Sequence, residues 1–187
     1  AHMYQPERPV TPESVMNSGW LFHKGPRYDG EDLPLKFQEC SQVSDGYARI
    51  IVCDGEGLQK LCLTTDDATV LAGWGQAVDG ISLKSRGDNL LEPQGAHNAF
   101  EKAIRMARIP PESIGVMETH DCFSVMLPLT AEIIGRAKPG QGLEYFLEYM
   151  TGAGNDLPTN TSGGLIAKGH PIAATGVAMI GWVHQQI

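Results

Sequence analysis

The stretch from Asn160 to Gly176 constrains this chain more than any other, reading Asn-Thr-Ser-Gly-Gly-Leu-Ile-Ala-Lys-Gly-His-Pro-Ile-Ala-Ala-Thr-Gly. It places His170 between a glycine-rich turn and an apolar run that begins at Pro171. Glycine allows backbone angles that a Cβ would forbid, and proline suits the first turn of a helix. Because the first N–H groups of a helix are unpaired and lie at its positive dipole end, an imidazole there is placed to hold an oxyanion or a thioester oxygen. The stretch therefore predicts a functional histidine at the entrance of a final helix.

Charge and composition narrow the class of protein. The 187 residues carry a formal net charge of -8, with 42% hydrophobic and 19% charged residues, which is ordinary for one globular domain or one and a fraction. Lysine and arginine are scattered, so the sequence predicts neither a nucleic-acid partner nor a membrane partner. No apolar run approaches the roughly 20 residues that a membrane span needs. The four cysteines show no Cys-x-x-Cys spacing and indicate free thiols, so we expect a reducing, cytoplasmic setting.

Hydrophobic periodicity divides the chain into strands and helices. Apolar, β-branched runs predict buried strands at 44–53, 69–78 and 114–118. Apolar residues at three- and four-residue spacing, with proline and threonine at helix starts, predict helices at 12–18, 94–107, 123–134, 143–149 and 171–186. The order strand, strand, helix, strand, helix, long loop, helix fits a layered α/β domain.

A second cluster of reactive side chains follows the third expected strand. The run His-Asp-Cys-Phe from His120 to Phe123 stands between that strand and the next helix, and functional sites of α/β folds gather at the carboxyl ends of strands. A helix N-terminus favours the thiolate, so we expect a lowered pKa that suits Cys122 to act as base or nucleophile. A lone cysteine is more often a small buried hydrophobe. It is the combination with His170 that predicts a converging acyl-transfer site, whereas no ligand spacing supports a metal.

Taken in order, the motifs that begin at His120 and Asn160 resemble those of the C-terminal half of a thiolase, most closely the sterol-carrier-protein-X branch (SCP2-thiolases). This resemblance implies a thiolase-like layered α/β fold. Residues 4–63 would then be a linker and the last strand of an N-terminal domain, and residues 64–187 a C-terminal domain that is incomplete at its end. Further stretches fit the central region of the same family, namely Ser18-Gly-Trp, Cys40-Ser-Gln-Val-Ser-Asp-Gly and Gly73-Trp-Gly-Gln-Ala.

The resemblance also implies a chemistry, the thiolysis or Claisen formation of 3-ketoacyl-CoA, with coenzyme A as a substrate and no metal or other cofactor. By the family pattern, His170 stabilises the thioester oxygen and helps activate the nucleophile. His120 helps form the pocket that polarises the second acyl group, and Cys122 is the acid/base thiol. Physically this is coherent, because an enolate-like transition state needs preorganised donors at its oxygen and a base that titrates near neutrality. Three more residues are expected to contact the substrate: Phe123, Gly164 and Gly169.

The nucleophile of this family lies in its N-terminal half, in a small-residue motif that Cys40, Cys53 and Cys62 do not match. We therefore expect the chain to be inactive alone, and the intact protein to be an acyltransferase of lipid metabolism and at least a homodimer. In a eukaryote the resemblance also fits a peroxisome or mitochondrion. Two alternatives stay open. One is a non-catalytic thiolase-like module that binds acyl-CoA or complements a partner chain, and the other is a steroid side-chain aldolase.

Overall fold

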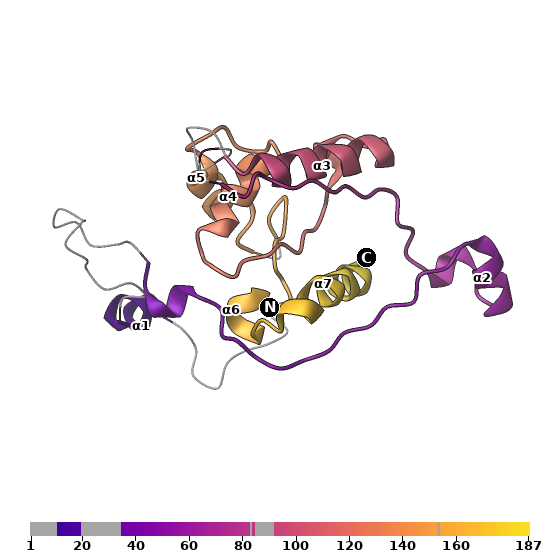
Figure 1. The fold of residues 1–187 in the computed structure, drawn as a ribbon, viewed down its shortest axis with the longest axis horizontal. Coiled ribbons are helices and arrows are strands. Elements are labelled where there is room, and N and C mark those ends of the chain that lie inside the picture. Colours follow the sequence, from indigo (N-terminus) through magenta and orange to yellow (C-terminus); the bar gives the residue numbers. More distant parts are fainter. Residues whose placement is uncertain (1–10, 20–34, 83, 85–91, 153) are drawn as a thin grey trace.

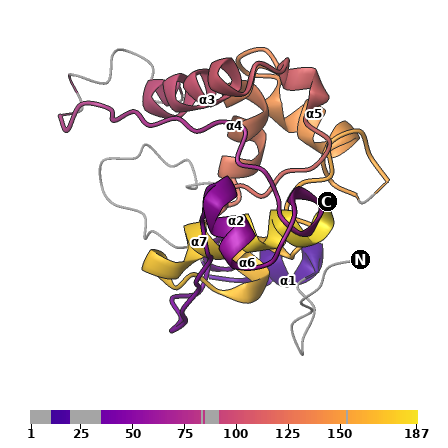
Figure 2. The ribbon, with the colours of Figure 1, turned by 90° about the vertical axis from the view of Figure 1, so that its right-hand side faces the viewer.

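The computed structural model describes residues 11–19, 35–82, 84, 92–152 and 154–187. Figures 1 and 2 agree that α3, α4 and α5 gather in one group and that α6 and α7 lie together in another. In Figure 1, α2 stands at the far end of two extended stretches, away from the other helices. The helices are α1 (Pro12–Asn17), α2 (Gly55–Lys60), α3 (Gln94–Ala107), α4 (Met126–Ile133), α5 (Gly142–Tyr149), α6 (Gly164–Lys168) and α7 (Ile172–Gln186), with 3-10 turns at Phe37–Glu39, Thr65–Asp67 and Pro111–Ser113.

Local sequence signals explain where the expected helices begin and end. The Thr11 hydroxyl accepts a hydrogen bond from the backbone N–H of Ser14 and caps α1. Arg108 takes a left-handed conformation with φ of 58° and closes α3, whose predicted bounds are confirmed. Glu132 on α4 accepts hydrogen bonds from the backbone N–H groups of Gly140 and Gly142, and so fixes the start of α5. The helices predicted at 12–18, 94–107, 143–149 and 171–186 are confirmed to within one or two residues.

The buried core lies where α4 packs against α5. Four hydrophobic side chains are buried there, namely Ala131, Ile134, Met150 and Leu157. Partly buried aromatic and aliphatic residues of α3, of α5 and of the segment before α4 surround them, including Phe100, Met117 and Phe146. Burial of this kind is the main source of stability for a small helical unit. No helix within the described ranges is both long and apolar enough to cross a membrane.

The three predicted strands do not pair into a sheet among the described residues. The segments 44–53 and 69–78 run outside any helix and form long extended stretches in Figure 1. Their apolar side chains face solvent, with Ile51 84% and Val78 85% exposed. An apolar run becomes a strand only when a neighbour supplies its hydrogen bonds. The described residues form isolated bridges alone, and none of these bridges involves 44–53 or 69–78. The layered sheet expected from the pattern is thus not formed by these residues by themselves.

Two short helices occur where the sequence suggested turns. Asp54 accepts a hydrogen bond from the backbone N–H of Gly57 at 2.9 Å and caps α2, in a run that we expected only to end a strand. The glycine-rich turn contains α6, which stops at Gly169 with φ of 82°.

Two predicted helices begin later than expected. Pro171 is the cap of α7 and not its first residue, so the last helix begins one position later than predicted. Helix α4 likewise begins at Met126, three residues later than expected.

Candidate active site

Two loops carry the candidate residues, and backbone hydrogen bonds hold them side by side. Met117 and Thr159 form a parallel bridge. The backbone N–H of Asn160 donates to the Met117 carbonyl at 2.9 Å, and its side-chain oxygen accepts from the backbone N–H of Thr119 at 2.7 Å. Asn160 is buried and holds φ of 51°, a left-handed conformation that asparagine tolerates better than most residues. The first residue of the glycine-rich motif thereby fixes the loop that ends in His120.

A third segment, Ser41 to Gly46, borders the same site. The backbone N–H of Ser41 donates to the carbonyl of Cys122 at 2.9 Å, and that of His170 donates to the carbonyl of Gln42 at 2.8 Å. A Cβ on Gly46 would touch the ring of Pro171 at 2.8 Å, so the segment lies close against the entrance of α7. Backbone hydrogen bonds therefore hold both loops, the one with Cys122 and the one with His170, against the same extended segment.

The rings of His120 and His170 meet at the junction of these loops. Their centroids are 4.7 Å apart and their planes are inclined by 80°, an edge-to-face contact. The two motifs predict that both residues belong to one converging site, and the structure brings the two rings together. Cys122 lies in the same loop as His120, two residues further on.

One hydroxyl group of α7 is hydrogen-bonded to the imidazole of His170. The Thr175 hydroxyl, on the first turn of α7, donates to the carbonyl of Pro171 at 3.0 Å. Its oxygen also lies 2.8 Å from Nδ1 of His170. A hydroxyl has one proton to donate, so when Thr175 bonds both partners at once its oxygen accepts from Nδ1, and Nδ1 then carries the hydrogen. The Nε2 atom of neutral His170 is then an unprotonated base.

The environment of His120 favours its neutral form. Partial burial lowers the pKa of the His120 imidazole, and the positive charge of a protonated His170 lowers it further. The carboxylate of Asp121 opposes both effects. At neutral pH the His120 imidazole is therefore uncharged. In this form His120 is suited to polar contacts with an uncharged group of the substrate.

Cys122 differs from its predicted state. Burial raises the pKa of its thiol, and the charges of Cys40 and Asp121 raise it further, whereas a hydrogen bond from the backbone of Phe123 lowers it. The expectation of a lowered pKa was wrong, because α4 begins only at Met126 and so no helix N-terminus adjoins the sulfur. Cys122 is a protonated thiol at neutral pH, which suits it to donate a proton more than to attack as a thiolate.

Asp121 connects the His-Asp-Cys-Phe loop to the glycine-rich turn. Its side chain is 4% exposed, and its Oδ1 accepts a hydrogen bond from the backbone N–H of Leu165 at 2.8 Å. Burial raises the pKa of this carboxyl, and the hydrogen bond from Leu165 opposes the rise. Asp121 had no predicted role. The signal in the sequence was an acidic residue between two candidate residues, and its burial, which requires hydrogen-bond partners, is seen only in the folded chain.

The three residues expected to contact the substrate lie in the two loops that carry the candidate residues, and their predicted role stays a prediction. Phe123 pairs with Cys40 in an antiparallel bridge. Gly164 has φ of 63°, and a Cβ there would overlap the carboxylate of Asp121. Gly169 has φ of 82°, and a Cβ there would overlap the hydroxyl of Ser44. Both glycines therefore allow protein atoms to approach closely, which is a structural reason for glycine at these positions.

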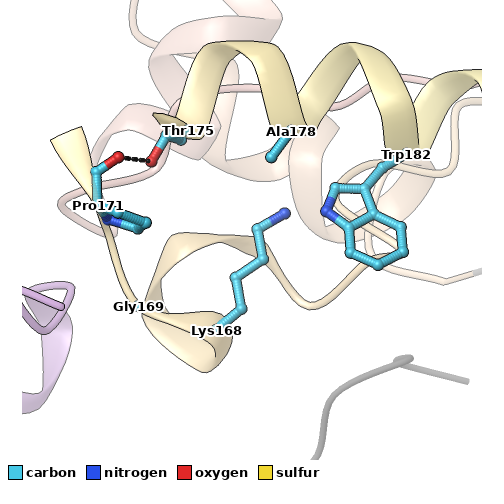
Figure 3. Close-up of a pocket in the computed structure, with 6 residues that line it drawn as sticks. All are labelled: Lys168, Gly169, Pro171, Thr175, Ala178 and Trp182. Carbon is cyan, nitrogen blue, oxygen red and sulfur yellow. Dashed lines mark hydrogen bonds between the residues drawn. The ribbon is translucent and has the colours of Figure 1, made fainter. Parts of the chain in front are cut away.

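A small cavity opens between α6 and α7 beside His170. Its volume is about 190 Å³, and it is lined by Lys168, Gly169, Pro171, Thr175, Ala178 and Trp182. Figure 3 shows the Lys168 side chain extending toward α7, with its nitrogen near the indole of Trp182. The ammonium lies 5.6 Å from the indole ring centroid, a cation–π distance. The cavity is mostly apolar and lies next to the Thr175 hydroxyl that orients the imidazole.

Comparisons with known proteins place these motifs in a family. A family model for a thiolase C-terminal domain-like region matches residues 75–187. The acetyl-CoA acetyltransferase of Methanothermobacter thermautotrophicus is 35% identical over 178 residues, 95% of this chain and 43% of that protein. Sterol carrier protein 2 of Homo sapiens is 31% identical over 147 residues, 77% of this chain and 26% of that protein.

A solved structure shares the fold. The Ltp2-ChsH2(DUF35) aldolase superposes with a TM-score of 0.65 at 18% identity, over 91% of this chain and 42% of that one. At this identity the likeness is one of fold, and it identifies a thiolase-type fold together with the family model. The chain spans less than half the length of these relatives. Since the family model covers more than half of its residues, the chain belongs to the thiolase family.

Proposed function

We propose that this chain belongs to a thiolase-type acyltransferase that acts on 3-ketoacyl-CoA and coenzyme A, and that it carries the side chains that act as acid and base. The observation that carries the proposal is the edge-to-face contact of His120 with His170, whose Nδ1 is hydrogen-bonded to the Thr175 hydroxyl so that Nε2 is the nitrogen left for the substrate. The names of the relatives, acetyl-CoA acetyltransferase and sterol carrier protein 2, support this substrate class. Residues 64–187 would be the C-terminal domain, and 4–63 a linker and the last strand of an N-terminal domain.

In this mechanism the bare Nε2 of His170 takes the proton of a nucleophilic thiol. The thiolate attacks the keto carbon of the substrate, and cleavage of the adjacent carbon–carbon bond leaves its electron pair on an acetyl-CoA enolate. The Cys122 thiol protonates that enolate, since its raised pKa keeps it protonated at neutral pH. His120 would donate a hydrogen bond to the enolate oxygen as it gains charge. In the second half of the reaction the thiol of coenzyme A gives its proton to the Cys122 thiolate and attacks the carbonyl of the enzyme thioester. The carbon–sulfur bond to the enzyme breaks, and the released nucleophilic sulfur takes back the proton that His170 holds.

The nucleophilic thiol of this scheme would come from outside the residues of this chain. Cys53 and Cys62 are exposed and lie beside α2, far along the chain from the two histidines. We propose that the intact protein supplies the thiol from its other half, because relatives are more than twice as long as this chain. It would be at least a dimer, and it would work in a reducing compartment that keeps its four free cysteines as thiols.

The intact protein would also complete the layered α/β sheet. The extended segments 44–53 and 69–78 expose apolar side chains, and a strand on either side would bury them and pair their backbone groups. The family fold supports this arrangement.

The test is Cys122→Ala in the full-length protein, assayed for thiolysis of acetoacetyl-CoA. Loss of a general acid is expected to lower kcat by about 10²–10⁴-fold, while acyl-CoA binding measured by calorimetry stays near wild type. The matched control is Cys53→Ala, which removes an exposed thiol and is expected to leave both values unchanged. Undiminished turnover in Cys122→Ala would show that the thiol is not the acid. A wild-type protein that binds acyl-CoA without turnover would favour the non-catalytic module.

A further inference from the structure

A buried carboxylate connects the two loops that carry the histidines. Glu118 stands two residues before His120, and its side chain is 1% exposed. Its Oε1 accepts hydrogen bonds from the backbone N–H of Ser162 and from the side-chain amide of Gln186, both at 3.1 Å. Its Oε2 accepts the Ser162 hydroxyl at 2.6 Å. A carboxylate so fully enclosed and bonded fixes the position of every group that donates to it.

Lys168 completes this arrangement from the other loop. It stands two residues before His170, and its side chain is 11% exposed. Its ammonium donates to the Ser162 hydroxyl oxygen at 2.7 Å and lies 3.7 Å from Oε2 of Glu118. Burial lowers the pKa of Lys168, and the negative charges of Glu118 and Asp121 raise it. The lysine is thus a partnered cation inside the protein and not a surface charge.

The partners of Glu118 bracket α6. Ser162 precedes the turn at Gly163 and Gly164, and Lys168 is the last residue of α6 before Gly169. A single carboxylate therefore holds both ends of the short helix that leads to His170. Buried ion pairs contribute little net stability compared with apolar packing, and their best-attested use is to specify one geometry.

We propose that Glu118, Ser162 and Lys168 form a positioning unit that sets the separation of the His120 and His170 rings. Its relevance to catalysis rests on the proposed function, since the two imidazoles are the polar groups of that site. The unit touches neither ring, and it acts through the backbone two residues upstream of each histidine.

The test is the NMR titration of the His120 imidazole in this chain, compared with Ser162→Ala and Glu118→Gln. His170 and Asp121, the charged neighbours of His120, remain in every variant. Because a protonated His170 lowers the pKa of His120, rings that move apart give a higher midpoint. Ser162→Ala changes no charge, so a purely electrostatic role of the cluster predicts no shift for it. Glu118→Gln removes a negative charge, so the same purely electrostatic role predicts a lower midpoint, whereas positioning predicts a higher one.

We expect the His120 midpoint to rise in Ser162→Ala and in Glu118→Gln, toward the value of about 6.5 of an ordinary histidine, with loss of the ring-to-ring nuclear Overhauser effect. Glu56→Gln is the control, because it breaks the exposed Glu56–Lys60 pair at 2.8 Å and is expected to shift nothing. An unchanged or lower midpoint in folded Ser162→Ala overturns the proposal, and this variant decides the case should Glu118→Gln not fold. The titration involves no turnover, so its outcome is independent of whether the intact protein is a thiolase.

Discussion

The Thr175 hydroxyl decides which nitrogen of His170 is available for chemistry. Thr175→Val keeps the shape of the side chain and removes the acceptor of the Nδ1 proton. We expect this variant to lose the preference for the Nδ1–H tautomer, because nothing else in the first turn of α7 is bonded to that nitrogen. Long-range proton–nitrogen NMR spectra of the ring, recorded above its pKa, distinguish the two tautomers directly.

Thr175→Ser is the matched control, since it retains the hydroxyl that donates to Pro171 and accepts from His170. Its ring nitrogens are expected to match those of the wild type. In the intact enzyme, Thr175→Val should lower kcat with little change in KM. In part of the molecules Nε2 of His170 would carry the proton and could not act as the base, whereas the contacts to the substrate would remain. A Thr175→Val ring that keeps its proton on Nδ1 would contradict the assignment.

The pKa values at this site show why single residues are hard to interpret from sequence. The motif identified Cys122 and His120 as reactive, but it gave the wrong direction for the thiol. That direction depends on burial and on Cys40, which lies far away in sequence and is brought near by the segment from Ser41 to Gly46. Desolvation is a property of the packed structure, so no local pattern contains it.

Among the elements, the contact of segment 69–78 with α3 depends on glycine. A Cβ on Gly75 would overlap the carbonyl of Ala99, and one on Gly73 would overlap the carbonyl of Ala103. We expect Gly75→Ala to push the segment off α3 and to lower the free energy of unfolding by about 1–3 kcal/mol, the usual cost of overpacking. Urea denaturation followed by circular dichroism measures this loss.

Gly115→Ala provides the control for that substitution. A Cβ on Gly115 has no neighbour within 4 Å, so the same chemical change adds no clash. Its free energy of unfolding should stay within about 0.5 kcal/mol of the wild type, as for surface substitutions in general. Equal losses in the two variants would mean that segment 69–78 does not pack tightly on α3.

The helices could be predicted from the sequence far better than the strands. The bounds of α3 are confirmed because its spacing of apolar residues, its start after Pro93 and its left-handed end at Arg108 are all local. The segment 44–53 has an equally clear apolar pattern, yet it forms no strand pair among the described residues, because a strand depends on partners from distant parts of the protein. Of the site, the two histidines could be predicted from motifs, whereas Glu118 and Thr175 act through contacts made only in the folded chain.

At the scale of the whole molecule, the described residues divide into a packed part and an extended part that packs little. The helices α4 and α5 enclose a packed core, whereas the stretches 44–53 and 69–78 present apolar side chains to water, with Val70 72% and Ile51 84% exposed. Between residues 45 and 52 and between 70 and 75, no backbone hydrogen bond forms within the described part of the chain. Exposed, unpaired extended segments are templates for pairing with further strands.

Hydrogen–deuterium exchange tests whether those strands come from the rest of the intact protein. In this chain alone, amides of 45–52 and 70–75 should exchange at nearly unprotected rates, while amides of α4 and α5 are slow because their bonds open only with the core. In the full-length protein, the amides of both segments should become protected, since strands bonded on both edges pair the N–H groups that alternate between those edges. The helix amides serve as the internal control, with equal rates expected in both samples. Segments that exchange equally fast in both proteins would exclude the completed sheet.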